Sequence, residues 1–239
     1  MKKLLLILML LASFSLQAQF EKYFHDKSLR IDYYHTGDHE SEIFSIDELL
    51  AEPKWGGSKI NLVDTFRLGK YYFEVIDLAS DSLIYSRGYS TLFGEWQTTA
   101  EAKETSKSFS ESVLFPFPKN DVRVDFYSRN WEGEFEIKFT YEVDVDSYFI
   151  KPERRLEYPV YEAYISGDPA ESVDILILPD GYTKREMALF QQDCNTFMDA
   201  LFSFSPYDQN MDKFNIRGVL APSEDSGVDI PADSVWKNT

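Results

Sequence analysis

Hydrophobic and polar residues alternate with a period of two over long stretches of the first 150 residues. The stretch "EFEIKFTYEVDV" (residues 134–145) has a hydrophobic side chain at every second position from Phe135 to Val145, separated by Glu, Lys, Thr and Asp. This pattern predicts a strand with one buried and one solvated face. The preceding stretch "VRVDFYSRNWEG" also alternates and ends in turn residues at 130–133, so the two stretches are predicted to pair as a hairpin.

Other stretches of the same region extend this pattern. "KYYFEVIDLASDSLIYSRGYS" predicts a second hairpin, in which residues 71–78 and 83–89 flank a polar break at 80–82. "SKSFSESVLFPFPK" predicts a strand that ends at Pro116 and Pro118, since prolines are tolerated at sheet edges and strand ends. No convincing helical period separates these strands. Residues 19–150 are therefore expected to fold as an antiparallel sandwich or barrel, and we favour a β-sandwich.

The pattern changes after residue 150. Residues 151–172 are polar and rich in proline, which predicts a linker and connecting strand. Residues 173–178 are apolar except for Asp174, and we interpret this run as a strand that is buried on both faces. A helix is predicted over "TKREMALFQQDCNTFMDALF", and residues 214–220 predict a further strand. Residues 173–239 are thus expected to begin an α/β domain (strand, helix, strand) and to be a truncated part of it.

The predicted helix has a recognisable start and one apolar face. Thr183 and Glu186 have the spacing of a capping box, in which each satisfies an unpaired backbone N–H of the first turn. Hydrophobic side chains recur every three or four residues, which predicts a core face rather than a cofactor site. The residues of this stripe are Met187, Phe190, Cys194, Phe197, Met198 and Leu201. Cys194 is the single cysteine, and its place in the stripe predicts a small core residue rather than a nucleophile.

The first residues have the composition of a targeting segment. Lys2 and Lys3 precede an apolar run that ends near Ala18, so residues 1–18 are predicted to be a signal peptide, with an uncleaved anchor as the alternative. The mature protein is then expected to be secreted or periplasmic, without a membrane span and without an internal disulfide. Without the two lysines, 22 basic residues stand against 41 acidic ones, and the net charge changes from −17 to −19. Nucleic acid is therefore excluded as a main partner.

Strong catalytic motifs are absent from the sequence: it contains no His-Glu-x-x-His, no Gly-x-Ser-x-Gly, no phosphate-binding loop and no paired cysteines. In "HTGDHE", His35 and His39 flank turn residues and could approach each other as zinc ligands, with Asp38 or Glu40 as a further ligand. We favour the simpler interpretation that both are solvated histidines beside an exposed turn.

Two further segments hold candidate site residues. The loop "PSEDSGVDIPAD" gathers Glu224, Asp225, Asp229 and Asp233, whose oxygen atoms suit calcium, although a solvated acidic loop is favoured. In "PDGYT", Asp180 and Tyr182 are cleft-edge candidates, because the carboxyl end of a strand there meets a helix N-terminus. The alternative is that Gly181 permits a tight turn and the segment is purely structural.

Two regions of the chain resemble a known family. The string "DILILPDGYTKREMALFQQDCNTFMDALFSFSPYDQNMDKFNIRGVLAPSEDSGVDIP" is similar to the start of the catalytic domain of the secreted bacterial zinc metallopeptidases called IgA peptidases. The strings "RIDYYHTGD", "NLVD", "LIYSRGYSTLFGEWQTTAEA" and "SFSESVLFPFPK" resemble that family's N-terminal β domain. Together these regions cover nearly the whole predicted mature chain.

The resemblance implies a zincin-like catalytic domain after residue 172. In that family a His-Glu-x-x-His helix supplies two zinc ligands and the general base that activates a metal-bound water for peptide hydrolysis. Those residues are not in this sequence, so no catalytic residue is assigned, and residues 1–239 alone are expected to be inactive. Zinc and a protein or peptide substrate are expected for the full-length enzyme, with zinc ligands outside this chain.

A non-catalytic alternative belongs to a different class of function. Aromatic residues make up 16% of the chain, and Trp55, Trp96 and Trp131 could stack on sugar rings or protein ligands from the face of a β-sandwich. This would make the protein a secreted binding protein for glycans or proteins. The interpretation requires that these tryptophans be exposed.

Overall fold

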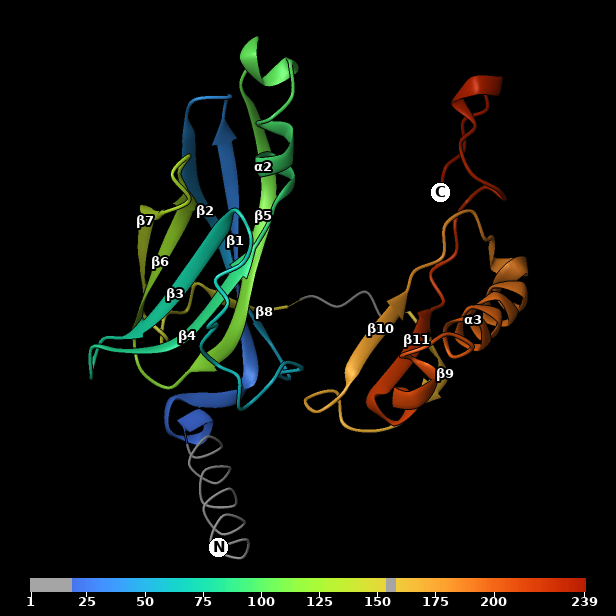
Figure 1. The fold of residues 1–239 in the computed structure, drawn as a ribbon, viewed down its shortest axis with the longest axis horizontal. Coiled ribbons are helices and arrows are strands. Elements are labelled where there is room, and N and C mark those ends of the chain that lie inside the picture. Colours follow the sequence, from blue (N-terminus) through green and yellow to red (C-terminus); the bar gives the residue numbers. More distant parts are fainter. Residues whose placement is uncertain (1–18, 154–157) are drawn as a thin grey trace, which may run out of the picture. The chain divides into compact units, whose positions relative to one another are not determined.

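The computed structural model describes residues 19–153 and 158–239. The predicted signal peptide, residues 1–18, and residues 154–157 of the predicted linker lie outside the described residues. The chain divides into two compact units, a first unit that ends at Glu153 and a second unit that ends at Thr239 (Figure 1). Among the described residues, no helix is both long and apolar enough to span a membrane.

The described residues of the first unit contain two four-stranded sheets (Figure 1). In spatial order the first sheet contains β5 (Lys107–Pro118), β1 (Phe24–Gly37), β2 (Glu42–Glu52) and β8 (Ile150–Pro152). The second sheet contains β4 (Ser82–Tyr89), β3 (Tyr71–Asp77), β6 (Val122–Arg129) and β7 (Phe135–Val143). The two predicted hairpins, β3–β4 and β6–β7, are confirmed, and β5 is an edge strand that ends at a proline, as predicted. One pairing departs from the antiparallel prediction, because the short strand β8 runs parallel to β2.

The two sheets of the first unit face each other across one hydrophobic core. Tyr33 of β1 lies edge-on to Phe126 of β6 with 5.4 Å between ring centroids, and Phe73 of β3 packs 6.1 Å from Phe115 of β5. All four side chains are buried. The first unit is therefore rich in strands, as predicted, and its stability comes from apolar burial between two layers.

The prediction of one buried face along β7 is wrong for its first half. Ile137 is 56% exposed, whereas Phe139, two residues later, packs 5.8 Å from Phe126. The reason is a β-bulge: Phe126 pairs with Phe139 but Tyr127 pairs with Ile137, so Lys138 has no partner in the register. A single inserted residue moves the side chains that precede it to the opposite face.

A short helical segment that the sequence analysis did not predict lies between β4 and β5. It contains α2 (Leu92–Trp96) and the 3₁₀ helix η1 (Glu101–Lys103). The Thr91 hydroxyl caps α2 by accepting a hydrogen bond of 3.1 Å from the Gly94 N–H. Phe93 and Trp96 are buried in a small cluster with Phe109, so this helix forms because of packing rather than length.

The second unit is a three-stranded sheet with one covering helix. Its strands, in spatial order, are β10 (Val173–Ile177), β11 (Phe214–Val219) and β9 (Val160–Ile165). Its helices are α3 (Met187–Leu201) and the 3₁₀ segments η2 (Lys184–Glu186), η3 (Asp208–Lys213) and η4 (Pro231–Asp233). β10 and β11 are parallel and α3 connects them, which confirms the predicted strand, helix and strand. β9, which lies within the predicted linker region, adds an antiparallel edge to the same sheet.

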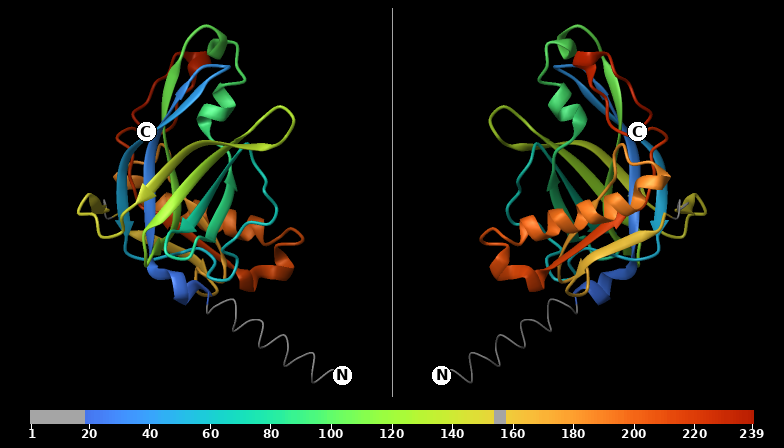
Figure 2. Two further views of the ribbon diagram at one scale, coloured as in Figure 1. Left: turned by 90° about the vertical axis from the view of Figure 1, so that its left-hand side faces the viewer. Right: turned by 90° about the vertical axis from the view of Figure 1, so that its right-hand side faces the viewer.

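Two predictions about burial in the second unit are wrong. The run at 173–178 is not buried on both faces, because Val173 is 53% and Leu176 59% exposed. β10 is an edge strand, and α3 packs mainly over β9 and β11 (Figure 2). In the helical stripe, Phe190 and Cys194 are buried as predicted, but Phe197 is 43% exposed. Met187, Met198 and Leu201 are half-buried.

Candidate functional site

His35 lies inside the core of the first unit. Along β1, the side chains of Leu29, Ile31, Tyr33 and His35 all point to the buried face, so the period of two carries the imidazole inward. The ring is fully buried and stacked between two phenyl rings, with centroid distances of 4.1 Å to Phe44 and 3.9 Å to Phe93.

Both nitrogen atoms of His35 contact carboxylates. Nδ1 lies 3.0 Å from Oε2 of Glu111, and Nε2 lies 3.1 Å from Oε2 of Glu42. We call these three residues the Glu42–His35–Glu111 triad. A neutral imidazole carries one N–H, so it can donate to only one of the two carboxylates, whereas an imidazolium donates to both. The arrangement therefore favours the protonated ring.

The pKa shifts of the triad agree with this geometry. Burial by itself would lower the pKa of His35, but the hydrogen bonds to Glu111 and Glu42 outweigh it and raise the pKa above its ordinary value. Burial would likewise raise the pKa of each glutamate. Hydrogen bonds from His35, with one from the Phe93 N–H to Glu111, instead lower both glutamate pKa values.

The preferred prediction for His35 and His39 is thus wrong for His35, which is not solvated. His39 does lie at the turn, partly exposed and 3.4 Å from Glu40, but the structure does not bring it together with His35. The sequence does contain a signal for the triad. Glu42 lies two residues before Phe44, and Glu111 lies two residues after Phe109. Side chains two residues apart in a strand share a face, so both carboxylates point to the face that carries His35.

The acidic loop near the end of the chain uses its carboxylates to bind backbone groups. Asp229 accepts a hydrogen bond of 2.6 Å from the Lys237 N–H, and Asp225 accepts one of 3.1 Å from the Asn238 N–H. Glu224 and Asp233 are exposed, and the Glu224 N–H donates to the Asn238 carbonyl at 3.2 Å. Within residues 19–153 and 158–239, no three His, Cys, Asp or Glu side chains come together as a metal site.

The "PDGYT" turn is organised around Gly181. Its φ of +75° suits glycine, and a Cβ there would lie 2.4 Å from the Gly227 carbonyl oxygen. The Tyr182 hydroxyl donates to Asp193 at 2.8 Å, and Asp180 is exposed. The capping box that follows is confirmed, with the Thr183 N–H donating to Glu186 at 2.9 Å. The contacts of this turn are structural, and a cleft-edge role for Asp180 and Tyr182 stays a prediction.

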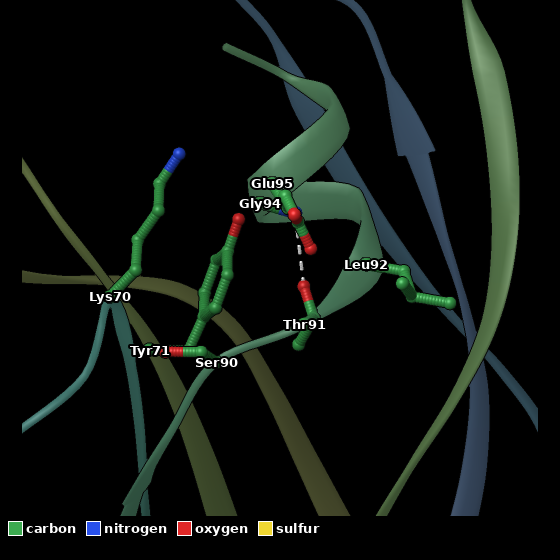
Figure 3. Close-up of a pocket in the computed structure, with 7 residues that line it drawn as sticks. All are labelled: Lys70, Tyr71, Ser90, Thr91, Leu92, Gly94 and Glu95. Carbon is green, nitrogen blue, oxygen red and sulfur yellow. Dashed lines mark hydrogen bonds between the residues drawn. The ribbon is translucent and has the colours of Figure 1, made fainter.

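A pocket of about 530 Å³ opens between the start of β3 and α2 (Figure 3). Its walls are formed by Lys70, Tyr71, Ser90, Thr91, Leu92, Gly94 and Glu95. Tyr71 is fully buried, and its hydroxyl has no hydrogen-bond partner among the described residues. Burial lowers the pKa of Lys70, whose ammonium donates to Gln97. The pocket thus offers polar groups, and the Tyr71 ring that forms its wall also lies edge-on to His35 at 5.2 Å.

The tryptophans do not form a common exposed face. Trp55 is 4% and Trp96 9% exposed, and only Trp131 of the three is fully exposed. Trp55 packs edge-on to Tyr85 in the core, and Trp96 packs beside Phe93. Two of the three side chains on which the binding-protein alternative depends are therefore unavailable for stacking on a ligand.

Comparison with protein families gives two matches in sequence order. Residues 19–140 match the family model described as Peptidase M64 N-terminus, which covers the strands β1 to β6 and most of β7. Residues 162–239 match the model described as IgA Peptidase M64, which covers most of the second unit. No curated protein matches the chain.

Proposed function

The chain belongs to the IgA peptidase M64 family, and from this premise we propose that it is the N-terminal portion of a secreted zinc metallopeptidase. The first unit is a non-catalytic β domain that positions substrate or anchors the enzyme. The second unit is the opening of a zincin-like catalytic domain. The observation that carries the proposal is the β10–α3–β11 unit, a parallel strand, helix and strand inside the region matched to the peptidase family.

The residues present do not fit a catalytic zinc site. Catalytic zinc is held by three protein ligands, mostly histidines and carboxylates, and keeps one position open for water. Of the three histidines, His35 is enclosed by two carboxylates and stacked rings, while His25 and His39 stand apart from any group of three ligands in the described part of the chain. We therefore assign the zinc ligands and the catalytic base to residues outside 1–239, and no catalytic step to this chain.

The exposed surface of the second unit supports a place within a larger domain. α3 covers one face of the sheet, and the other face carries Val160 and Leu176, which are 51% and 59% exposed. Between them Arg217 forms a hydrogen bond of 2.8 Å with Asp174. Parallel sheets in α/β proteins are usually covered on both faces, so this open face and the β10 edge are suitable surfaces for further packing within the catalytic domain.

A peptidase assay on purified residues 19–239 tests this proposal. The chain is incubated with an unfolded protein substrate and with a library of fluorogenic peptides, with added zinc and with a chelator, beside an active zinc peptidase as the control. The expected result is no hydrolysis above background and less than one bound zinc per chain. Chelator-sensitive hydrolysis by this segment would contradict the proposal.

A further inference from the structure

We propose that the Glu42–His35–Glu111 triad is a proton-operated lock that seats α2 against the β core and thereby shapes the pocket beside Tyr71. The lock is closed while the imidazole carries a proton on each nitrogen and both glutamates are ionised. Loss of the imidazole proton at alkaline pH, or protonation of the glutamates in acid, opens it.

The geometry of the triad makes its stability depend on the number of protons on the His35 ring. Each imidazole nitrogen faces a carboxylate oxygen, at 3.0 and 3.1 Å, in a site where His35 is fully buried. When the imidazolium loses a proton, one ring nitrogen presents a lone pair to a carboxylate at that distance. Contacts of 3.0 and 3.1 Å leave no room for a water between the ring nitrogen and the carboxylate, so the repulsion is costly in this buried site of low dielectric.

Two contacts connect the triad to α2 directly, and a third connects them through Tyr71. The Phe93 N–H donates to Oε1 of Glu111 at 3.1 Å, so one carboxylate holds both the imidazole and the first turn of the helix. The Phe93 ring stacks on His35 at 3.9 Å. Gly94 is pressed against the ring of Tyr71, where a Cβ would lie 2.7 Å from the nearest ring carbon. A five-residue helix has little stability of its own, so its position depends on these contacts.

The same helix forms one wall of the pocket. Leu92, Gly94 and Glu95 line it from α2, and Tyr71 lines it from β3 (Figure 3). Tyr71 contacts both His35 and Gly94, so a change in the triad can move two walls of the pocket, the Tyr71 ring and α2. Opening of the lock is therefore expected to alter the pocket before it unfolds the unit.

Three tyrosines and two lysines lie close enough to interact with the carboxylates of the triad. Burial raises the pKa of each nearby tyrosine above its ordinary value of 10.0, so these hydroxyls stay neutral. Burial lowers the pKa of Lys70, whose charge attracts Glu42, and Lys138 attracts Glu42 in the same way. These tyrosines and lysines are Tyr33 on β1, Lys70 and Tyr71 at the start of β3, Tyr89 on β4 and Lys138 on β7.

The signs of the shifts define two edges of a pH window. The pKa of His35 is raised, so its stabilising contribution is complete below its ordinary value of 6.5 and is lost as the pH rises through the folded value. The pKa values of Glu42 and Glu111 are lowered, so their contribution is complete above 4.5 and is lost as the pH falls through the folded values. The lock is closed between these edges.

The test measures the protonation of His35 and the amide exchange of α2 in the chain of residues 19–239. The imidazole signals of its histidines are followed by NMR from pH 4 to pH 10, with His25 and His39 as references in the same molecule. Amide exchange of residues 92–104 is measured over the same range and corrected for its intrinsic pH dependence. We expect His35 to deprotonate above pH 6.5, and the α2 amides to exchange about 10- to 100-fold faster above that transition, as a charge-assisted hydrogen bond is lost.

One substitution distinguishes an effect of His35 protonation on α2 from an effect of packing alone. In Glu111→Gln the amide oxygen still accepts from the Phe93 N–H, while the amide N–H₂ donates to a neutral imidazole, which in turn donates to Glu42. This variant is expected to lose the alkaline acceleration of exchange, whereas the control His39→Gln is expected to keep it. A neutral His35 at pH 6 in the unsubstituted chain, or an α2 whose exchange ignores the His35 transition, would overturn the proposal.

Discussion

The two units of this chain bury their hydrophobic residues very differently. In the first unit a continuous core of buried side chains runs from Phe20 to Val143 and joins both sheets. In the described part of the second unit, the buried hydrophobic side chains are Phe190, Cys194 and Ile216. The two sheets of the first unit enclose the core of a self-sufficient domain, whereas the sheet and helix of the second unit enclose few buried side chains. A correct local pattern, such as β10–α3–β11, therefore does not by itself complete a core.

The largest contrast between the units is expected from a pair of phenylalanine truncations. Phe126 is fully buried between the sheets, so Phe126→Ala should destabilise the first unit by about 3–5 kcal/mol. Phe197 is 43% exposed on α3, so Phe197→Ala should cost less than about 1 kcal/mol. Both losses of stability can be measured by denaturant unfolding, with amide exchange in β6 reporting on the first unit and amide exchange in α3 on the second. Equal losses of stability would contradict the difference in burial between the two units.

A smaller effect is expected at two glycines with positive φ. Gly181→Ala in the second unit should cost more than about 2 kcal/mol, because the added Cβ meets the Gly227 carbonyl in addition to the left-handed backbone cost. Gly133 in the first unit has a φ of +86° but open space around its Cβ position, so Gly133→Ala should cost only about 1 kcal/mol. Thermal unfolding of the two variants provides the measurement. A larger loss of stability in Gly133→Ala than in Gly181→Ala would show that the turn at Gly181 can move to accommodate the added Cβ.

The smallest effects are expected from two threonines of the α3 region. Thr183 caps the helix through its reciprocal contacts with Glu186, so Thr183→Ala should destabilise the second unit by about 1 kcal/mol. Thr196 is exposed in the middle of α3, so the same substitution there should stabilise it slightly, since alanine is the better helix former. Thermal unfolding followed by helical circular dichroism should show a lower unfolding temperature for Thr183→Ala and a slightly higher one for Thr196→Ala. Shifts in the same direction would contradict a capping role for Thr183.

The local elements were largely predictable from the sequence. Period two located β3, β4, β6 and β7, and the spacing of Thr183 and Glu186 located the start of the helix. These features are encoded by residues close together in the chain, so a single sequence contains the necessary information.

What the sequence did not reveal depends on contacts between distant residues. The bulge at Lys138 exposes Ile137, and nothing in "EFEIKFTYEVDV" marks which residue lacks a partner. The apolar run at 173–178 predicted burial, but only the strand order shows that β10 lies at an edge. The triad was missed for the same reason: the alternation places Glu42 and Glu111 on the inward face, but their meeting at His35 requires that β2 and β5 both pair with β1.

The comparison between the units is tested most directly by amide exchange at two matched edge strands in residues 19–239. β7 is an edge strand of the first unit and β10 of the second, so the position at the edge is held constant. The amides of β10 that bond to β11 should exchange at least about 10-fold faster than those of β7 that bond to β6. The reason is that α3 packs mainly over β9 and β11 and leaves β10 without a fully buried residue, whereas β7 packs against the core through Phe139 and Val143. Equal or greater protection of β10 would contradict the account of the second unit as an open part of a larger catalytic domain.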